Sequence, residues 1–440
     1  MVNKAVVEAA NPNPEGTVFI SYRRDDGKEY ANEIGALLRA VGLRVWRDIY
    51  NMPAGKTPEA LEKVLGEETS GGVLIVTPNI CESDMVINTE APMLCRLAKD
   101  SNFPLAVANA VAIAGGKVDY GAPDEFLRTG SETLGQSNQF NILDQRGIKD
   151  LVVKLLHARM LYVNEKMQKE IRDTIVIDMQ SRTPPSAIEN ENGDLQIRIN
   201  PDDDDSGKPS KQGLEDLKIA LPLVKNALEN LPRNKTIRIT GGMHLTPALA
   251  VGAAFPVTKP RNVEVLDSRN ELWRSERDVD VPDDAIKTQV KRPYGKVEGP
   301  KNRIAVMVSM ANTPDHEIFD RMVEKDELGF DKRIIISSEY KNIDPRWAAT
   351  LSQRIVDEIR AEAANRPEIH LAFHGPVALA ILVGRLLNTY KIIAYERLET
   401  ASGRSAYRPT LKIDVGAVAP IQEVFDSSAL GDDRLKRPVR

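Results

Sequence analysis

Short apolar runs alternate with amphipathic stretches along the first part of the chain. The run TVFIS, from residue 17, predicts a strand, and the apolar positions within residues 28–42 recur at helical spacing. LRVW at residues 43–46, GVLIVT at residues 72–77 and PLAVANAV from residue 104 predict three more strands, the second of them buried on both faces. This order predicts right-handed crossovers and a parallel α/β sheet with helices on both sides.

A faint internal repeat marks the second half of the chain. TIRITGGMHLTPALAVGAAF, from Thr236, aligns with EIHLAFHGPVALAILVGRLL, from Glu368, and each reads as a strand, a glycine turn and a helix of small residues. Two tandem α/β units are the simplest interpretation, and they would place two strand-end crevices side by side. We attribute Gly252 and Gly384, one in each copy, to close packing of a helix on a sheet.

A shift in composition separates the two parts. Residues 176–212 contain a Pro-Pro pair and four consecutive aspartates, interrupted by one alternating strand, DLQIRIN. Such a segment predicts a linker or domain boundary, and we interpret the aspartates as a solvated turn rather than a metal site. We therefore expect one domain over residues 15–175 and another over residues 213–425.

Composition narrows the class of protein. A chain of 440 residues with 42% hydrophobic and 28% charged residues is expected to form two or three globular domains. Its net charge of -5 argues against the capture of long nucleic acid. Since the sequence shows no signal peptide or membrane-spanning run, and the two cysteines, Cys81 and Cys95, fit a reducing compartment, we expect a cytoplasmic protein with no membrane partner.

Polar and aromatic residues follow the first two strands, at the end where parallel sheets bind ligands. The carboxyl end of the first strand carries Ser21, Tyr22 and Arg23, and the same end of the second strand carries Trp46 and Asp48. Aromatic faces, a guanidinium fork and a carboxylate can hold an adenine, phosphates and a ribose, although a charged surface turn is the alternative. The well-known glycine loops for phosphate and the common hydrolase and zinc motifs are absent, and we predict no metal site.

The first part of the chain resembles a TIR domain over residues 15–160. The resemblance rests on VFISYRR, on LRVWRDIYNMPAGK with its Pro-x-Gly loop end, and on Thr77-Pro78-Asn79 ahead of a helix. It implies a flavodoxin-like fold and, in enzymatic members, cleavage of NAD+ between nicotinamide and ribose. NAD+ is then a substrate rather than a cofactor. Its expected contacts are Ser21, Tyr22, Arg23, Trp46, Asp48 and Gly55.

The resemblance also implies a catalytic glutamate, usually within Ser-x-Trp-x3-Glu. The segment Ser83-Asp84-Met85-Val86-Ile87-Asn88-Thr89-Glu90 lacks the tryptophan and is one residue longer, so Glu90 is the best match and Glu82 the second candidate. One carboxylate can suffice, because nicotinamide leaves as a neutral molecule and only the oxocarbenium-like ribose needs stabilisation. The altered motif keeps open an alternative, a non-catalytic scaffold that assembles with other TIR proteins.

The second part, through EIHLAFHGPVALAILVGRLL, KIIAYERLE and YRPTLKI, resembles a SAVED domain, a sensor of two fused CARF-like units, over residues 190–425. The resemblance implies a cyclic oligonucleotide activator made during phage infection, with a cyclic triadenylate as the expected form. Helix N-termini after glycine turns can bind its phosphates. The predicted ligand-binding residues are Gly241, Gly242, His244, Trp273, Ser309, His374 and Gly375.

Together the two resemblances imply an anti-phage effector, in which a sensor controls an NAD+ glycohydrolase. They further imply that ligand binding drives neighbouring TIR domains into a head-to-tail assembly, and such heterologous contacts form filaments unless a ring closes. The expected partners are NAD+, the cyclic oligonucleotide and further copies of the chain. Whether the sensor also cleaves its ligand is left open by the sequence.

Overall fold

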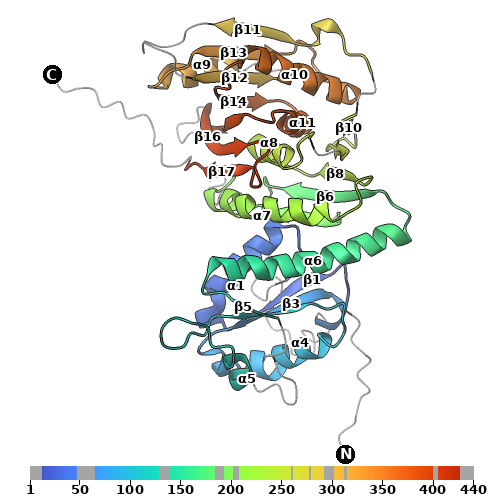
Figure 1. Ribbon diagram of the computed structural model, residues 1–440, viewed down its shortest axis with the longest axis vertical. Coiled ribbons are helices and arrows are strands. Elements are labelled where there is room, and N and C mark those ends of the chain that lie inside the picture. Colours follow the sequence, from blue (N-terminus) through green and yellow to red (C-terminus); the bar gives the residue numbers. More distant parts are fainter. Residues whose placement is uncertain are drawn as a thin grey trace, which may run out of the picture. The chain divides into compact units, whose positions relative to one another are not determined.

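Strands and helices alternate along most of the chain in the computed structural model (Figure 1). The structure describes residues 12–46, 65–127, 134, 138–183, 193–201, 208–258, 261–276, 279–291, 302–311, 315–399 and 405–426. The chain divides into two compact units after Arg172, and Leu195–Ile197 groups with the first of them. Within these ranges, no helix combines the length and the apolar character needed to cross a membrane.

The first unit contains a parallel sheet with strand order β2-β1-β3-β4-β5. Its strands are β1 (Thr17–Ser21), β2 (Val45–Trp46), β3 (Thr69–Val76), β4 (Leu105–Asn109) and β5 (Asn138–Asn141). This is the flavodoxin-like order, and it confirms the parallel α/β sheet expected from the sequence. The last six residues of β3 are all buried, which explains why this part of the strand carries no polar side chain.

Helices connect these strands. They are α1 (Arg24–Ala40), η1 (Ile80–Glu82), η2 (Val86–Glu90), α4 (Ala91–Leu97), α5 (Ala122–Leu127) and α6 (Gln145–Lys169). In α1, Ile34 and Leu38 lie one turn apart and are fully buried, as the helical spacing predicts. Gly42 follows the helix with a φ of +95°, a conformation that glycine adopts without steric cost.

Two further sheets follow in the second part of the chain. The first has the order β10-β9-β8-β6-β7 and the second the order β11-β13-β12-β14-β15-β16-β17. The first is built from β6 (Thr174–Gln180), β7 (Leu195–Arg198), β8 (Thr236–Thr240), β9 (Val263–Leu266) and β10 (Leu272–Arg274). The second is built from β11 (Lys287–Lys291), β12 (Arg303–Ser309), β13 (Lys332–Ser337), β14 (Glu368–His374), β15 (Lys391–Glu399), β16 (Ser405–Asp414) and β17 (Ile421–Val424).

Helices pack with these two sheets, and each set of elements contains one copy of the internal repeat. The elements β6 to β10 form the first repeat, together with α7 (Lys211–Glu229) and α8 (Leu245–Ala254). The elements β11 to β17 form the second repeat, together with η5 (Asp283–Ala285), α9 (His316–Lys325), η6 (Pro345–Trp347), α10 (Ala348–Glu362) and α11 (Val377–Leu386). The tandem α/β architecture expected from the sequence repeat is therefore present.

The segment at residues 176–212 differs from the expected linker. Most of β6 and all of β7 fall within it, and both strands belong to the sheet of the first repeat. Ile175, Ile177 and Met179 alternate along β6 and are buried, which is the pattern of a sheet strand. The proline pair and the aspartate run that suggested a linker lie at residues 184–185 and 202–205, outside the described residues.

The helices α8 and α11 pack directly against one another (Figure 1). A Cβ atom on Gly252 would lie 2.0 Å from the carbonyl oxygen of Ile381, and one on Gly384 would lie 2.3 Å from that of Leu249. The contact is reciprocal, because Leu249 precedes Gly252 by the same interval as Ile381 precedes Gly384. The two glycines therefore permit a helix-on-helix contact between the repeats, not the helix-on-sheet packing that we expected.

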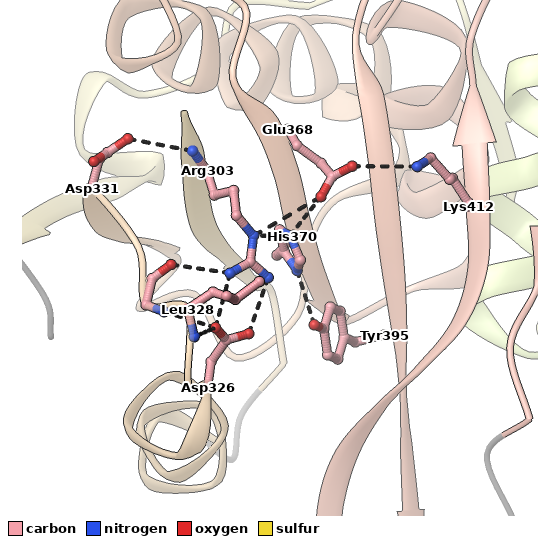
Figure 2. A network of polar contacts seen from close by, with 9 residues as sticks. Arg303, Asp326, Leu328, Asp331, Glu368, His370, Tyr395 and Lys412 are labelled. Atoms are coloured by element: carbon pink, nitrogen blue, oxygen red, sulfur yellow. Dashed lines mark hydrogen bonds and ion pairs between the residues drawn. The ribbon is translucent and has the colours of Figure 1, made fainter. Parts of the chain in front are cut away.

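A polar network lies at the amino ends of β12 and β14 (Figure 2). Arg303 donates from Nη1 and Nη2 to the carboxylate of Asp326, at 2.9 and 3.0 Å, and from Nε to Nε2 of His370, at 3.1 Å. The other ring nitrogen of His370 lies 2.9 Å from the Tyr395 hydroxyl, and its Nε2 also lies 3.1 Å from Glu368. His370 is therefore held in the core of the second repeat, with partners on both ring nitrogens.

This network predicts a pH-dependent stability. Burial, together with the charge of Arg303, lowers the pKa of His370 from its ordinary value of 6.5 to about 4. Between pH 4 and pH 6.5, His370 is protonated in the unfolded chain but neutral in the folded chain. The contribution of His370 to the free energy of unfolding is therefore fully present above pH 6.5 and decreases as the pH falls toward 4. We expect a loss of about 2 kcal/mol at pH 5 from this residue, since each pKa unit is worth about 1.4 kcal/mol.

Calorimetric melting at pH 7 and pH 5 measures this loss. In His370→Gln, the second unit should lose less stability between the two pH values than it does in the unmodified chain. The matched control is His157→Gln, which changes an exposed histidine on α6 and should keep the full pH dependence. An identical pH dependence in His370→Gln and the unmodified chain would contradict the prediction.

Candidate active site and ligand-binding sites

Glu90 lies beyond the carboxyl end of β1. Ser21, the last residue of that strand, donates a hydrogen bond from Oγ to Oε2 of Glu90 at 2.6 Å. Both side chains are buried, with exposed fractions of 1% and 8%. This short hydrogen bond fixes one oxygen of Glu90 at the strand end.

A π-helical turn delivers Glu90 to this position. The turn spans Val86–Glu90, and the N–H of Ala91 bonds to the carbonyl of Val86, five residues earlier. Pro92 follows and has no N–H to continue an α-helical ladder at this point. A π turn accommodates one more residue than an α turn. The extra residue between Ser83 and Glu90 therefore lies in a segment that can absorb it.

Arg23 is surrounded by carboxylates. Its Nη2 lies 2.6 Å from Glu82 and 2.9 Å from Asp25, and its Nη1 lies 3.4 Å from Asp26. These contacts engage both terminal nitrogens, which form the fork that a guanidinium presents to a phosphate. The two candidate glutamates differ in their surroundings. The side chain of Glu82 is 59% exposed and paired with Arg23, whereas Glu90 is buried at the strand end.

The remaining predicted contacts to NAD+ differ in their surroundings. Trp46 is 6% exposed and stacks on Phe19, with ring centroids 5.0 Å apart, so it belongs to the core of the first unit. Tyr22 is also buried and packs against Gly27. A Cβ added to Gly27 would lie 3.1 Å from the Cβ of Tyr22. Asp48 and Gly55 lie outside the described residues. Among the predicted contacts within the described ranges, Ser21 bonds directly to Glu90.

Thr77 is a site residue to which the sequence analysis assigned no contact. It follows β3, the neighbour of β1, and its Oγ1 is buried without a hydrogen-bond partner among the described residues. Such an unsatisfied hydroxyl at a strand end is available to a bound molecule. The signal in the sequence was a polar residue placed directly after a fully apolar strand. Asn109, which ends β4, is by contrast satisfied by Asp119, Gln139 and Val111.

In the first repeat, other residues of the chain already contact the glycine turn after β8, at the positions where a ligand was expected. Gly241 has a φ of +106°, and a Cβ there would lie 2.2 Å from the carbonyl oxygen of Met179. The N–H of Gly242 already donates to Oε1 of Gln180 at 2.9 Å. His244 is 6% exposed. Its backbone N–H and its Nδ1 each form a hydrogen bond of 2.9 Å with the Ser181 hydroxyl.

The N-terminus of α8 is also occupied. Thr246 donates from its N–H and from Oγ1 to Oε2 of Glu396, at 3.0 and 2.9 Å. Glu396 comes from β15 of the second repeat and is 4% exposed, and burial raises its pKa. The hydrogen-bond acceptor that the N–H groups of a helix N-terminus require is thus supplied by the chain. The phosphate site expected after Gly241 and Gly242 is filled by this carboxylate.

The second repeat offers a more open polar cluster at the carboxyl ends of β14 and β15. Oδ2 of Asp315 lies 3.0 Å from Nε of Arg397 and 3.8 Å from Nδ1 of His374, and it accepts from the Tyr407 hydroxyl at 3.3 Å. Burial lowers the pKa of His374, Asp315 opposes this shift and Arg397 adds to it. The Arg397 side chain is 44% exposed, so this cluster presents a guanidinium to solvent. No local pattern in the sequence marked Asp315, Arg397 or Tyr407 as site residues.

The other predicted ligand contacts are mainly structural. Gly375 follows His374, and a Cβ there would lie 2.9 Å from Cβ of Met310. Trp273 is 3% exposed and donates from Nε1 to Asp267 at 3.1 Å, across the turn between β9 and β10. Ser309 is 2% exposed at the end of β12, beside His374 in the sheet. No group of three or more metal-ligating side chains occurs among the residues described here.

Comparison with known proteins gives two family matches. Residues 18–110 match the TIR domain, and residues 220–413 match SAVED, the SMODS-associated and fused to various effectors sensor domain. No curated protein matches the chain.

Solved structures also align with the chain. The Cap4 SAVED/CARF-domain containing receptor of Acinetobacter baumannii, solved with the cyclic trinucleotide 2'3'3'-cAAA, is 12% identical over 90% of this chain and 88% of its own, with a TM-score of 0.43. The Moraxella osloensis Cap4 receptor is 13% identical over 90% and 87%, with a TM-score of 0.41. A TIR-STING receptor from C. gigas, in complex with 2',3'-cGAMP, is 11% identical over 53% and 92%, with a TM-score of 0.26.

Proposed function

Because the chain carries a TIR domain at residues 18–110 and a SAVED sensor domain at residues 220–413, we propose that it is a ligand-controlled NAD+ glycohydrolase of anti-phage signalling. The observation that carries this proposal is the hydrogen bond from Ser21 to Glu90 at the carboxyl end of β1. It joins the catalytic glutamate expected from the TIR motif to the strand end where a parallel sheet binds its ligand.

The chemistry requires one anionic group. Cleavage of the bond between nicotinamide and ribose releases nicotinamide as a neutral molecule, so no side chain has to protonate the leaving group. The electron pair of the broken bond leaves with nicotinamide, the ribose becomes oxocarbenium-like, and the Glu90 carboxylate stabilises this positive charge. A water molecule then adds to the same ribose carbon and releases a proton to solvent, which gives ADP-ribose. Ser21 holds Oε2 and so fixes the Glu90 carboxylate at the strand end where the ribose would bind. The buried Thr77 hydroxyl supplies a further hydrogen bond to the substrate.

In the sensor, the cluster of Asp315, His374, Arg397 and Tyr407 is the proposed contact to a cyclic oligonucleotide. Arg397 is partly exposed and can form charge-assisted bonds with a phosphate. The N-terminus of α8 does not bind a phosphate of the ligand, because Glu396 already accepts its hydrogen bonds. This side of the sensor would contact the ligand through van der Waals packing only.

Control by the ligand requires a resting state of low activity. The ion pairs of Arg23 with Glu82, Asp25 and Asp26 belong to such a state, because they withhold the guanidinium from the phosphates of NAD+. Raising the active fraction from 1% to 99% needs about 5.5 kcal/mol of differential binding. Ligand binding together with head-to-tail contacts between neighbouring TIR domains would supply this free energy.

The alternative is a scaffold that assembles with other TIR proteins without catalysis. The occupied guanidinium of Arg23 and the low exposure of Glu90 favour it. Mixing the purified chain with NAD+ and a panel of cyclic di- and trinucleotides, including 2'3'3'-cAAA, separates the two functions. The enzyme releases nicotinamide with at least one ligand, whereas the scaffold releases none with any ligand, even where binding is measured.

Arg397→Ala is expected to weaken binding of the activating oligonucleotide roughly 10-fold to 100-fold. A hydrogen bond to a charged group is worth about 1.5–3 kcal/mol, and this change removes the exposed guanidinium of the cluster. Isothermal titration calorimetry with the activating cyclic oligonucleotide measures the effect. Arg321→Ala, at an exposed position on α9, serves as the control and should bind as the unmodified chain does. Equal affinities of the two variants would remove Arg397 from the site.

A further inference from the structure

A small cavity lies at the amino end of β8, the opposite end of that strand from His244. The carboxyl-terminal parts of α7, α8 and α11 converge there, and the cavity measures about 30 Å³. It is lined by Lys225, Leu228, Glu229, Ile237, Ala254, Phe255, Pro256, Arg261 and Arg385. Neither the glutamate site of the first unit nor the polar cluster of the sensor includes any of these residues.

The lining carries more positive than negative charge. It contains three cationic side chains and one carboxylate, that of Glu229. Arg385 is 5% exposed and donates from Nε to the Phe255 carbonyl at 2.7 Å and from Nη2 to the Arg261 carbonyl at 3.0 Å. No described carboxylate pairs with it, and burial alone lowers the pKa of Arg385 to about 10. A guanidinium buried in this way lacks a neutralising partner within the described chain.

Arg261 adds an unsatisfied donor to the same cavity. Its Nη2 donates to the Leu231 carbonyl at 3.0 Å, whereas its Nη1 is buried and has no hydrogen-bond partner among the described residues. A buried donor without a partner costs about 1–3 kcal/mol, and in native proteins it often marks a bound water or ion. The Glu229 carboxylate attracts the charge of Arg261, whereas burial is the one influence on Arg385. A water molecule would satisfy the donor but would leave the Arg385 charge uncompensated. An anion does both.

We propose that this cavity binds one small inorganic anion of the chloride class. The volume of about 30 Å³ is roughly twice what one water molecule needs, which suits a monatomic anion and is too small for a phosphate group. Arg261 belongs to the first repeat and Arg385 to α11 of the second. The anion therefore links the two repeats at the end of α8 and α11 that lies away from the proposed oligonucleotide contacts.

Thermal unfolding of the full-length chain tests the anion site. The melting temperature is measured in sodium chloride and in sodium gluconate at equal ionic strength, because gluconate is too large for the cavity. An anion that binds only the folded state stabilises it, and we expect chloride to raise the melting temperature of the second unit by ~2–8 °C. In Arg261→Met this difference should disappear, whereas it should persist in Arg321→Met. Equal melting temperatures in both salts, or an unchanged difference in Arg261→Met, would overturn the proposal.

A crystallographic measurement covers the case in which Arg261→Met fails to fold. Crystals of the unmodified chain grown in sodium bromide should show an anomalous peak in the cavity, within about 3.5 Å of a guanidinium nitrogen of Arg261 or Arg385. A cavity that contains only water under these conditions would exclude the anion site.

Discussion

Replacing Glu90 by glutamine is expected to lower NAD+ cleavage by at least ~10²-fold to ~10³-fold and to leave binding of the cyclic oligonucleotide unchanged. The substitution preserves shape, since the amide oxygen of glutamine can still accept the hydrogen bond from Ser21. It removes the negative charge that would stabilise the oxocarbenium-like ribose, and the loss of one preorganised group of this kind costs about 3–4 kcal/mol. Nicotinamide release, followed at saturating NAD+ and activator, measures the effect.

Glu82→Gln provides the matched control for this experiment. Glu82 was the second candidate from the sequence, but its side chain is exposed and paired with Arg23. This variant should therefore retain turnover within a few-fold of the unmodified chain. Full activity in Glu90→Gln with loss of activity in Glu82→Gln would transfer the catalytic role to Glu82. Full activity in both variants would assign the chemistry to another residue.

Gly252→Ala is expected to destabilise the second unit by at least about 3 kcal/mol. The new Cβ would lie 2.0 Å from the carbonyl oxygen of Ile381, and this neighbour is backbone that cannot rotate away. The helices α8 and α11 would have to separate, and both are almost wholly buried. Overpacking of a rigid core typically costs about 1–3 kcal/mol, and a backbone clash lies at or above the upper end. Urea unfolding of the purified variant measures the change.

The reciprocal contact supplies an internal check. Gly384→Ala should destabilise the chain by a similar amount, because its Cβ would lie 2.3 Å from the carbonyl oxygen of Leu249. The double variant should lose less than the sum of the two effects, since one separation of the helices relieves both clashes. Gly121→Ala is the control, because the nearest atom to its Cβ would lie at 3.4 Å. Unchanged stability in Gly252→Ala would mean that the two helices do not cross this closely.

Local patterns in the sequence were sufficient for the architecture. The apolar run of β3 predicted a strand buried on both faces, and the repeated strand, glycine turn and small-residue helix predicted the equivalent pairs β8–α8 and β14–α11. Glu90 could be singled out because it follows a family motif at nearly the usual spacing. Each of these signals lies within about 20 residues of sequence, where the period of the apolar positions reports the local structure directly.

The partners of the site residues required the tertiary structure. Trp46 looked like a ligand contact at a strand end, but it stacks on Phe19 of the neighbouring strand. The N-terminus of α8 looked free to bind a phosphate, but Glu396, 150 positions away, accepts its hydrogen bonds. The sequence around Phe19 or Glu396 gives no indication of these contacts.

The sequence by itself determined the strands, the helices, the two-part organisation and the candidate glutamate. Only the tertiary structure decided which polar and charged groups are already satisfied: Arg23 by three carboxylates, the N–H of Thr246 by Glu396, and Asp315 by Arg397 and Tyr407. The reason is physical. Hydrophobic periodicity is a property of neighbouring positions along the chain, whereas an ion pair or a helix cap depends on where the folded backbone brings distant side chains together.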